Sequence, residues 1–235
     1  MRLDELFKNL GYLAGTIGAQ MRDGACEGVP LAELDLTGEP PHKVALMGPA
    51  HVVLGDGDVF RAVVEPGPGS EEVLFSLADG KLGVSGGDAA TVVRLTMPAP
   101  RKLAVAGSGR MNAAKLARDG KISIAGSGRL EVAEAEGGRL KVSIAGSGRL
   151  MIDGKADALK LSIAGSGSCD GEGFLVDKAS VHIAGSGDAI FACNGEVAAH
   201  LMGSGNVIVR GSARCSVHSM GSGTVTCEPV RESAD

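Results

Sequence analysis

One tripeptide, Gly-Ser-Gly, occurs seven times along the chain, and this repetition limits the possible folds more than any other feature. The copies begin at Gly107, Gly126, Gly146, Gly165, Gly185, Gly203 and Gly221. The intervals between them are 19, 20, 19, 20, 18 and 18 residues. A fixed period of this size is typical of a solenoid, in which each repeat covers the apolar face of its neighbour.

Around each copy, apolar and polar residues alternate as they do in a strand with one buried face. In KVSIAGSGRLMI, residues 141–152, the apolar residues and both glycines fall on one side of the strand. We expect that side to face inward and the serine between the glycines to face outward. The inward position three residues before the serine holds Val105, Ile124, Ile144, Ile163, Ile183, Leu201 and Ser219, and the one three residues after it holds Met111, Leu130, Leu150, Cys169, Ala189, Val207 and Val225. Such columns predict a single-stranded parallel β-helix, an all-β fold.

Degenerate copies of the repeat precede the regular ones. Residues 44–54, VALMGPAHVVL, fit the template with Gly-Pro-Ala in place of Gly-Ser-Gly, and KLGVSGG at 81–87 resembles a further copy. We therefore expect about ten coils over residues 43–229, followed by a tail at 230–235.

The first part of the chain has a different period. In residues 2–22 the apolar residues recur at helical spacing: Leu3, Leu6, Phe7, Leu10, Leu13, Ile17 and Met21. We predict an amphipathic helix over residues 1–24 that covers the open first coil near Val44, because an isolated helix of this kind is marginal in water. Residues 25–42 contain three prolines and are predicted to be a linker or an irregular wrap.

Composition restricts the kind of partner. The chain carries a net charge of −5, one Tyr and no Trp, which makes nucleic acid an unlikely ligand because both a basic surface and stacking aromatics are lacking. No cofactor is indicated. The five cysteines, Cys26, Cys169, Cys193, Cys215 and Cys227, are odd in number and lack CxxC spacing. We expect buried thiols rather than a disulfide framework.

The repeated strand and Gly-Ser-Gly unit resembles the bacterial head GIN family, whose members are described as auto-transporter adhesins. The resemblance covers about residues 43–227. It implies a right-handed parallel β-helix and an exported or cell-surface protein.

Two outward columns are cationic. Lys102, Lys121, Lys141 and Lys160 stand six residues before the serine, and Arg110, Arg129 and Arg149 stand two residues after it. If the seven share one face, they form a groove for a polyanion such as an acidic polysaccharide or a membrane surface. The alternative is a solvated face whose long side chains splay apart.

A third outward column, four residues before the serine, ends in His182, His200 and His218. Met202 and Met220 occupy the next outward column, where earlier coils carry alanine. Histidine with methionine can bind copper or zinc, and the same half-apolar patch can mediate self-association. Simple drift of the repeat is the third explanation.

Catalysis finds less support in the sequence. The outward serines Ser127, Ser147, Ser166, Ser186, Ser204 and Ser222 lack a GxSxG elbow. The acids on the same face, Glu131, Asp170 and Asp188, do not fall in neighbouring rungs of one column, as a polysaccharide-cleaving site would require.

The sequence thus predicts a non-catalytic structural or interaction protein that binds a partner, a second copy of itself or an anionic surface. A polysaccharide-active or metal-dependent enzyme and an end-to-end polymerising scaffold remain as alternatives. Acidic and basic residues interrupt the N-terminal segment where a signal peptide would be apolar, so the sequence favours a cytoplasmic protein, with export as the alternative.

Overall fold

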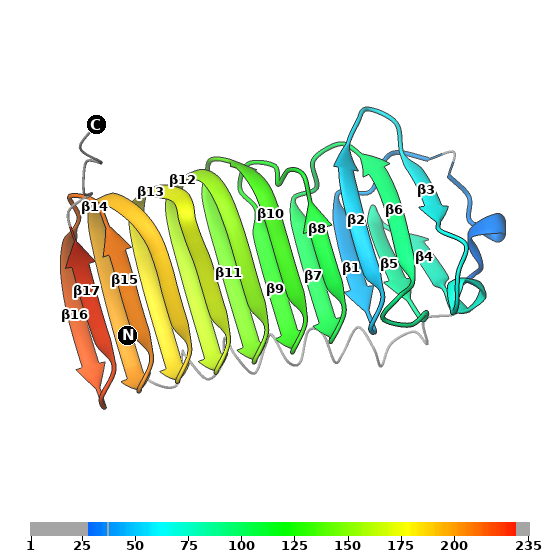
Figure 1. Ribbon diagram of the computed structural model, residues 1–235. Helices are drawn as coiled ribbons and strands as arrows, with labels where there is room; N and C mark the ends of the chain where they lie inside the picture. Colours follow the sequence, from blue (N-terminus) through cyan, green and yellow to red (C-terminus); the bar gives the residue numbers. More distant parts are fainter. Residues whose placement is uncertain (1–27, 37, 229–235) are drawn as a thin grey trace, which may run out of the picture.

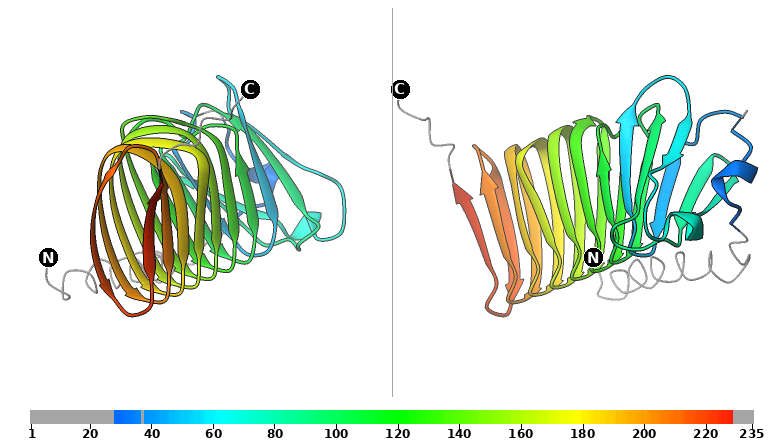
Figure 2. Two further views of the ribbon diagram at one scale, coloured as in Figure 1. Left: turned by 60° about the vertical axis from the view of Figure 1, so that its left-hand side comes forward. Right: turned by 45° about the vertical axis from the view of Figure 1, so that its right-hand side comes forward.

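The computed structural model describes residues 28–36 and 38–228, which form one continuous solenoid of β-strands (Figure 1). Two walls of parallel strands face each other and are joined by bends, as the view from the end in Figure 2 shows. The described residues contain two short 3-10 helices, η1 (Leu31–Glu33) and η2 (Ser70–Glu72). Among the described residues, no helix has the length and apolar character needed to cross a membrane.

Strands of the first wall lie side by side in the order β4, β5, β1, β7, β9, β11, β12, β13, β14 and β16. The second wall has the order β3, β6, β2, β8, β10, β12, β13, β14, β15 and β17. The strands confined to the first wall are β1 (Lys43–Met47), β4 (Leu74–Ala78), β5 (Lys81–Ser85), β7 (Lys102–Gly107), β9 (Lys121–Gly126), β11 (Arg139–Gly146) and β16 (Arg214–Met220). Those of the second wall are β2 (His51–Asp56), β3 (Arg61–Val64), β6 (Val92–Met97), β8 (Arg110–Ala113), β10 (Arg129–Glu136), β15 (Asn206–Arg210) and β17 (Thr224–Glu228). Strands β12 (Arg149–Gly165), β13 (Ser168–Gly185) and β14 (Asp188–Gly203) continue from the second wall into the first.

The predicted inward columns form the core. Ile124, Ile144 and Ile163 stack in register and are at most 1% exposed, and Leu130 and Leu150 form the facing column at 0%. The predicted outward position of the serines is confirmed, because Ser127, Ser147, Ser166, Ser186, Ser204 and Ser222 are all exposed. Period-two alternation was therefore the right guide to which side chains are buried.

The prediction that both glycines of the motif face inward is wrong for the first of them. Gly146 is exposed, and its φ of +111° belongs to a region that side chains rarely adopt. A Cβ there would lie 2.6 Å from the carbonyl oxygen of Gly126 in the preceding rung. Gly148 does face inward, where a Cβ would lie 2.4 Å from Cγ2 of Ile124. The first glycine thus makes the bend, and the second lets the rungs approach closely.

The expected ten coils are also wrong. Seven turns are built on the seven Gly-Ser-Gly copies, which join the first wall to the second. Upstream, β1 and β2 form one rung, and β5 and β6 form another. In space the rung of β1 and β2 lies between the rung of β5 and β6 and the rung of β7 and β8, so the rungs do not follow the order of the chain. Residues 57–80 do not add coils, because β3 and β4 pair antiparallel with β6 and β5.

The same strands explain why the coil near Val44 is not the open end. Strand β1 is paired along both edges, and the outermost layer consists of β3 and β4, with Phe75 and Val73 almost fully buried (0% and 2% exposed). Val29 pairs with Phe75, and Leu31, Leu34 and Leu36 pack against the core, so the predicted linker is an irregular wrap in this part. The predicted helix over residues 1–24 lies outside the described residues. The end that it was expected to cap is covered by β3, β4 and this wrap.

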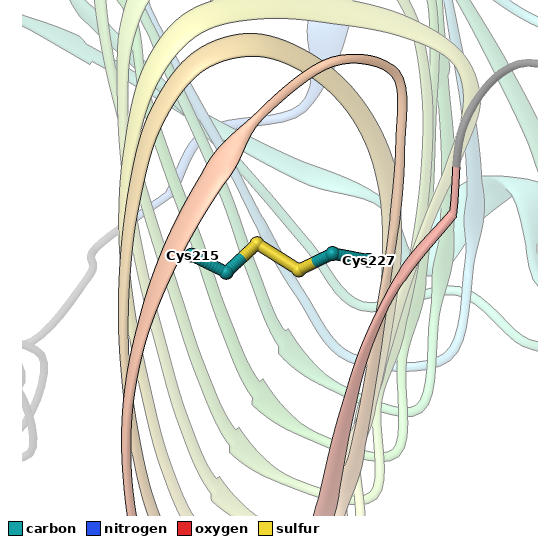
Figure 3. The surroundings of a disulfide bond; sticks show 2 residues. All are labelled: Cys215 and Cys227. Carbon is teal, nitrogen blue, oxygen red and sulfur yellow. A yellow bond between two sulfur atoms is a disulfide. The ribbon is translucent and has the colours of Figure 1, made fainter.

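At the opposite end, β16 and β17 each pair with one strand only within the described chain. The inward residue Val217 is consequently 44% exposed. A disulfide between Cys215 and Cys227 joins β16 to β17 across the interior of this last turn (Figure 3). The expectation of thiols without disulfides is wrong for this pair. Within residues 38–228 no further rung covers the interior of this one, and the covalent bond holds its two strands together.

The expectation of buried thiols is confirmed for Cys169 and Cys193, which are 4% and 0% exposed. Burial, with a smaller contribution from the neighbouring Asp170 carboxylate, raises the pKa of Cys169 to about 12. Burial also raises the pKa of Cys193. Both therefore act as small apolar residues at neutral pH. Cys26 lies outside the described residues.

Candidate anion-binding surface

Six lysines form one row on the outer face of the first wall. The register places Lys81, Lys43, Lys102, Lys121, Lys141 and Lys160 directly beside one another in six consecutive rungs. We call this set the lysine row. It confirms that the four predicted lysines share a column and adds Lys81 and Lys43. Lys43 was within reach of the sequence, because it precedes Pro49 by the same six residues that separate Lys102 from Ser108. Lys81 was harder to assign from the sequence, because β5 follows β1 in the chain but pairs with the edge of β1 that faces away from β7.

The lysine row carries charge that no described residue neutralises through an ion pair. Within the described chain, none of the six amino groups forms an ion pair. Neighbouring rungs are about 4.8 Å apart, so adjacent charges repel by about 0.9 kcal/mol in water. Partial burial, together with the charges of Lys102 and Lys141, lowers the pKa of Lys121. A row of this kind is a site where an anionic partner would relieve repulsion.

The predicted arginines also form a row, but on the other wall. Arg110, Arg129 and Arg149 begin β8, β10 and β12 and stand side by side in register. In each regular turn that has both residues, the lysine lies five residues before the first glycine of the Gly-Ser-Gly bend and the arginine follows that bend, so a strand segment of about 17 Å and the bend separate the two rows. The expectation that the seven cations share one face is therefore wrong. Arg149 also donates a hydrogen bond from Nε to Oγ of Ser168 at 3.1 Å.

Where the lysine row ends, the outer surface is hollowed. A depression of about 400 Å³ lies over β11, β12, β13 and β14. We call it the hollow. It is lined by Arg139, Leu140, Lys141, Ala158, Leu159, Lys160, Lys178, Ala179, Ser180, Glu196 and Ala198. Its rim is thus mainly cationic and its floor is made of small and aliphatic residues. Sequence reasoning missed the hollow because it depends on which side chains are short in neighbouring rungs.

The predicted histidine column exists as a stack of rings. The centroids of His182 and His200 are 5.0 Å apart and those of His200 and His218 are 5.1 Å apart, with planes 20° apart in both pairs. Imidazole lone pairs lie in the ring plane, so nearly parallel rings do not direct them to one point. Within the described residues, no group of three or more His, Cys, Asp or Glu side chains could hold a metal ion. The arrangement favours stacking over chelation.

His182 differs from the other two rings in its surroundings. Its Nδ1 is buried and has no hydrogen-bond partner among the described residues. Burial, followed by the charges of His200 and Lys160, lowers the pKa of the ring. The methionines predicted for self-association lie next to the histidine stack, where Met202 is half-buried and Met220 is 70% exposed. Their role in self-association remains a prediction.

The acids considered for catalysis are not adjacent. Glu131 pairs with Met151, and Met151 pairs with Asp170, so one rung separates the two carboxylates. Asp188 accepts hydrogen bonds from the backbone and side-chain amides of Asn206 at 3.0 and 3.1 Å. These three positions form no paired-carboxylate site.

Several solved structures have the same fold. A protein from Bacteroides fragilis described as a putative adhesin superposes with a TM-score of 0.72 at 17% identity, covering 80% of this chain and 93% of that one. A putative lipid binding protein from Parabacteroides distasonis gives 0.61 at 19% identity, covering 83% and 94%. A putative adhesin from Parabacteroides merdae gives 0.58 at 20% identity, with the same two coverages. At these identities the likeness concerns the fold alone.

No curated protein matches the sequence. A family match, however, spans residues 40–213, which include the rung of β1 and β2 and the first six Gly-Ser-Gly copies with the strands that flank them. The resemblance noted from the repeat is thereby confirmed. The chain belongs to the family described as "putative auto-transporter adhesin, head GIN domain".

Proposed function

We propose that the protein is a non-catalytic, adhesin-like binding protein that holds an acidic polymer along the lysine row. The observation that carries this proposal is the alignment of six lysines in consecutive rungs without an acidic partner in the described chain. A linear polyanion laid along the solenoid axis would meet one amino group about every 4.8 Å. An acidic polysaccharide is the partner that this geometry supports best.

Family membership supports the adhesin-like part of the proposal. The family and two of the three structural neighbours are described as putative adhesins and the third as a putative lipid binding protein, and none of these descriptions indicates a catalytic function. The description also points to an exported or cell-surface protein rather than the cytoplasmic one that the N-terminal sequence favoured. The disulfide at the C-terminal end supports export, because such bonds persist in oxidising compartments.

End-to-end polymerisation is less well supported than polymer binding. Parallel stacking of one solenoid on the next needs two open ends, and β3 and β4 cover one of them with antiparallel strands. Homo-oligomerisation through the outer wall or through the end formed by β16 and β17 remains a prediction.

Two charge-matched triple variants test the proposed function. One replaces Lys102, Lys121 and Lys141 by Gln, and the other replaces Arg110, Arg129 and Arg149 by Gln. Each removes three positive charges from the outer surface, but only the first interrupts the lysine row. Retention on immobilised heparin in rising salt is the measurement, because attraction between exposed charges falls with ionic strength.

We expect the lysine variant to elute at much lower salt than the unmodified protein and the arginine variant to elute close to it. An equal loss of heparin retention in the lysine variant and the arginine variant would show that retention depends on net charge alone. Unchanged retention in the lysine variant would rule out the lysine row as the binding site.

A further inference from the structure

We propose that the hollow at the end of the lysine row binds one carboxylated sugar unit and so fixes the position of an acidic polysaccharide on the solenoid. This inference rests on the proposed function and names the chemical class of its ligand. The lysine row alone would hold any polyanion in any register along its length. A shaped site at one end would select among them.

The hollow exists because the outward side chains become short where the row stops. Continuing the register from Lys160, the next two positions of the column are Ser180 and Ala198. In the neighbouring outward column Ala158 lies between Arg139 and Lys178. Three short side chains among long ones therefore leave a depression of about 400 Å³. The side chains of Ala158 and Ala198 line it, and a sugar ring can present its C–H groups to them.

The charges around the hollow favour one anionic group at the side of the hollow that adjoins the lysine row. Lys141 and Lys160 form no ion pair within the described chain. Arg139 is 3.4 Å from Asp119 on its far side, in the preceding rung. A carboxylate placed between the two free lysines would therefore have two uncompensated amino groups to bind.

The opposite side of the hollow favours hydroxyl groups. Glu196 lines it and forms a long ion pair of 3.8 Å with Lys178, in which both side chains are mostly exposed. A carboxylate there repels a second anion but accepts hydrogen bonds from hydroxyls. The Ser180 hydroxyl adds a further donor and acceptor on the floor. An acyl chain would leave these groups unpaired, whereas a sugar ring with one carboxylate matches both sides.

The test uses two variants that add the same charge to the same column. Ser180→Lys fills the hollow and lengthens the row by one lysine, and the column evidently accepts lysine because Lys160 precedes it in register. Ser216→Lys places its lysine two rungs further on, at a position that does not line the hollow. The probe is digalacturonic acid, two linked sugars with one carboxylate each, and its affinity is measured by calorimetry. Retention of each variant on heparin is measured in parallel.

We expect the Ser180→Lys variant to bind digalacturonic acid with at least tenfold lower affinity than the unmodified protein, while its retention on heparin stays equal or increases. Ser216→Lys should bind the disaccharide like the unmodified protein. A second variant, Glu196→Ala, should also weaken disaccharide binding but strengthen heparin retention, because it removes a hydroxyl acceptor and a negative charge together.

Equal disaccharide affinity in the two lysine variants would overturn the hollow as a binding site and leave the lysine row untouched. Loss of heparin retention with intact disaccharide binding in a variant that replaces Lys43, Lys102 and Lys121 by Gln, none of which lines the hollow, would support two separate sites. If the unmodified protein binds vesicles of phosphatidylglycerol through the hollow, but not the disaccharide, the sugar assignment is wrong. If it binds neither heparin nor the disaccharide, the proposed function fails as well.

Discussion

Replacing the first glycine of one repeat by alanine should destabilise the solenoid strongly, and Gly146 is the clearest position for the test. A side chain at its φ of +111° costs about 1–3 kcal/mol in backbone strain. The new Cβ would also lie 2.6 Å from the carbonyl oxygen of Gly126. That oxygen cannot move freely, because it accepts a hydrogen bond of 3.0 Å from the amide of Ser147. Overpacking of this kind adds about 1–3 kcal/mol.

The total of about 2–6 kcal/mol corresponds to a drop in Tm of roughly 4–24 °C, at about 2–4 °C per kcal/mol for a chain of this length. Thermal unfolding followed by circular dichroism measures it. Two controls share the assay. Ser147→Ala changes an exposed side chain and should stay within about 0.5 kcal/mol. Gly67→Ala adds a Cβ with no atom within 4 Å and should be neutral.

A drop in Tm for Gly146→Ala no larger than that of Gly67→Ala would refute the reasoning, because both the positive φ and the contact with the preceding rung would then have no energetic effect. Equal drops for Gly146→Ala and Ser147→Ala would contradict the register of the bend.

Three further expectations concern the thiols and the histidine stack. Cys215→Ser should lower the free energy of unfolding by about 3 kcal/mol for a closed loop of this size, and a reducing agent should then have no further effect on Tm. Because the pKa of His182 is lowered on folding, the unfolded chain takes up the proton first, so stability should fall as the pH drops below about 6.5 and level off below the folded pKa. His182→Gln should reduce this slope in urea unfolding at pH 5 and pH 7.5. Cys169, with its pKa near 12, should resist iodoacetamide at pH 8 until the protein is unfolded; fast labelling of the folded protein would contradict its burial.

Much of the regular part of this fold follows from local alternation. The period of two placed Ile144 and Leu150 inward and Ser147 outward, and the constant repeat length placed Lys102, Lys121, Lys141 and Lys160 in one column. These features depend only on neighbouring residues and on equal spacing. Sequence reasoning failed at Gly146 because the bend interrupts the alternation. It also put the arginines on the same face as the lysines, because the bend that turns the chain onto the other wall was not recognised.

The two ends of the solenoid could not be predicted in this way, since their structure depends on pairing between distant segments. Strand β1 lies between β5 and β7, so the order of the strands in space differs from their order in the chain. Nothing in residues 57–80 indicates that β3 and β4 run antiparallel to their partners. The bond between Cys215 and Cys227 likewise depends on two positions that meet across the last turn, and an odd number of cysteines gave no reason to pair them.

The measurement that tests the account most directly is lysine acetylation of the unmodified protein with and without heparin, read residue by residue by mass spectrometry. The account predicts that Lys81, Lys43, Lys102, Lys121, Lys141 and Lys160 become protected together. Lys155, an exposed lysine of β12 outside the row, serves as the control and should react at the same rate in both samples. Protection of Lys155 to the same extent as the row, or protection of scattered lysines without Lys81 and Lys43, would contradict a single binding row on the first wall.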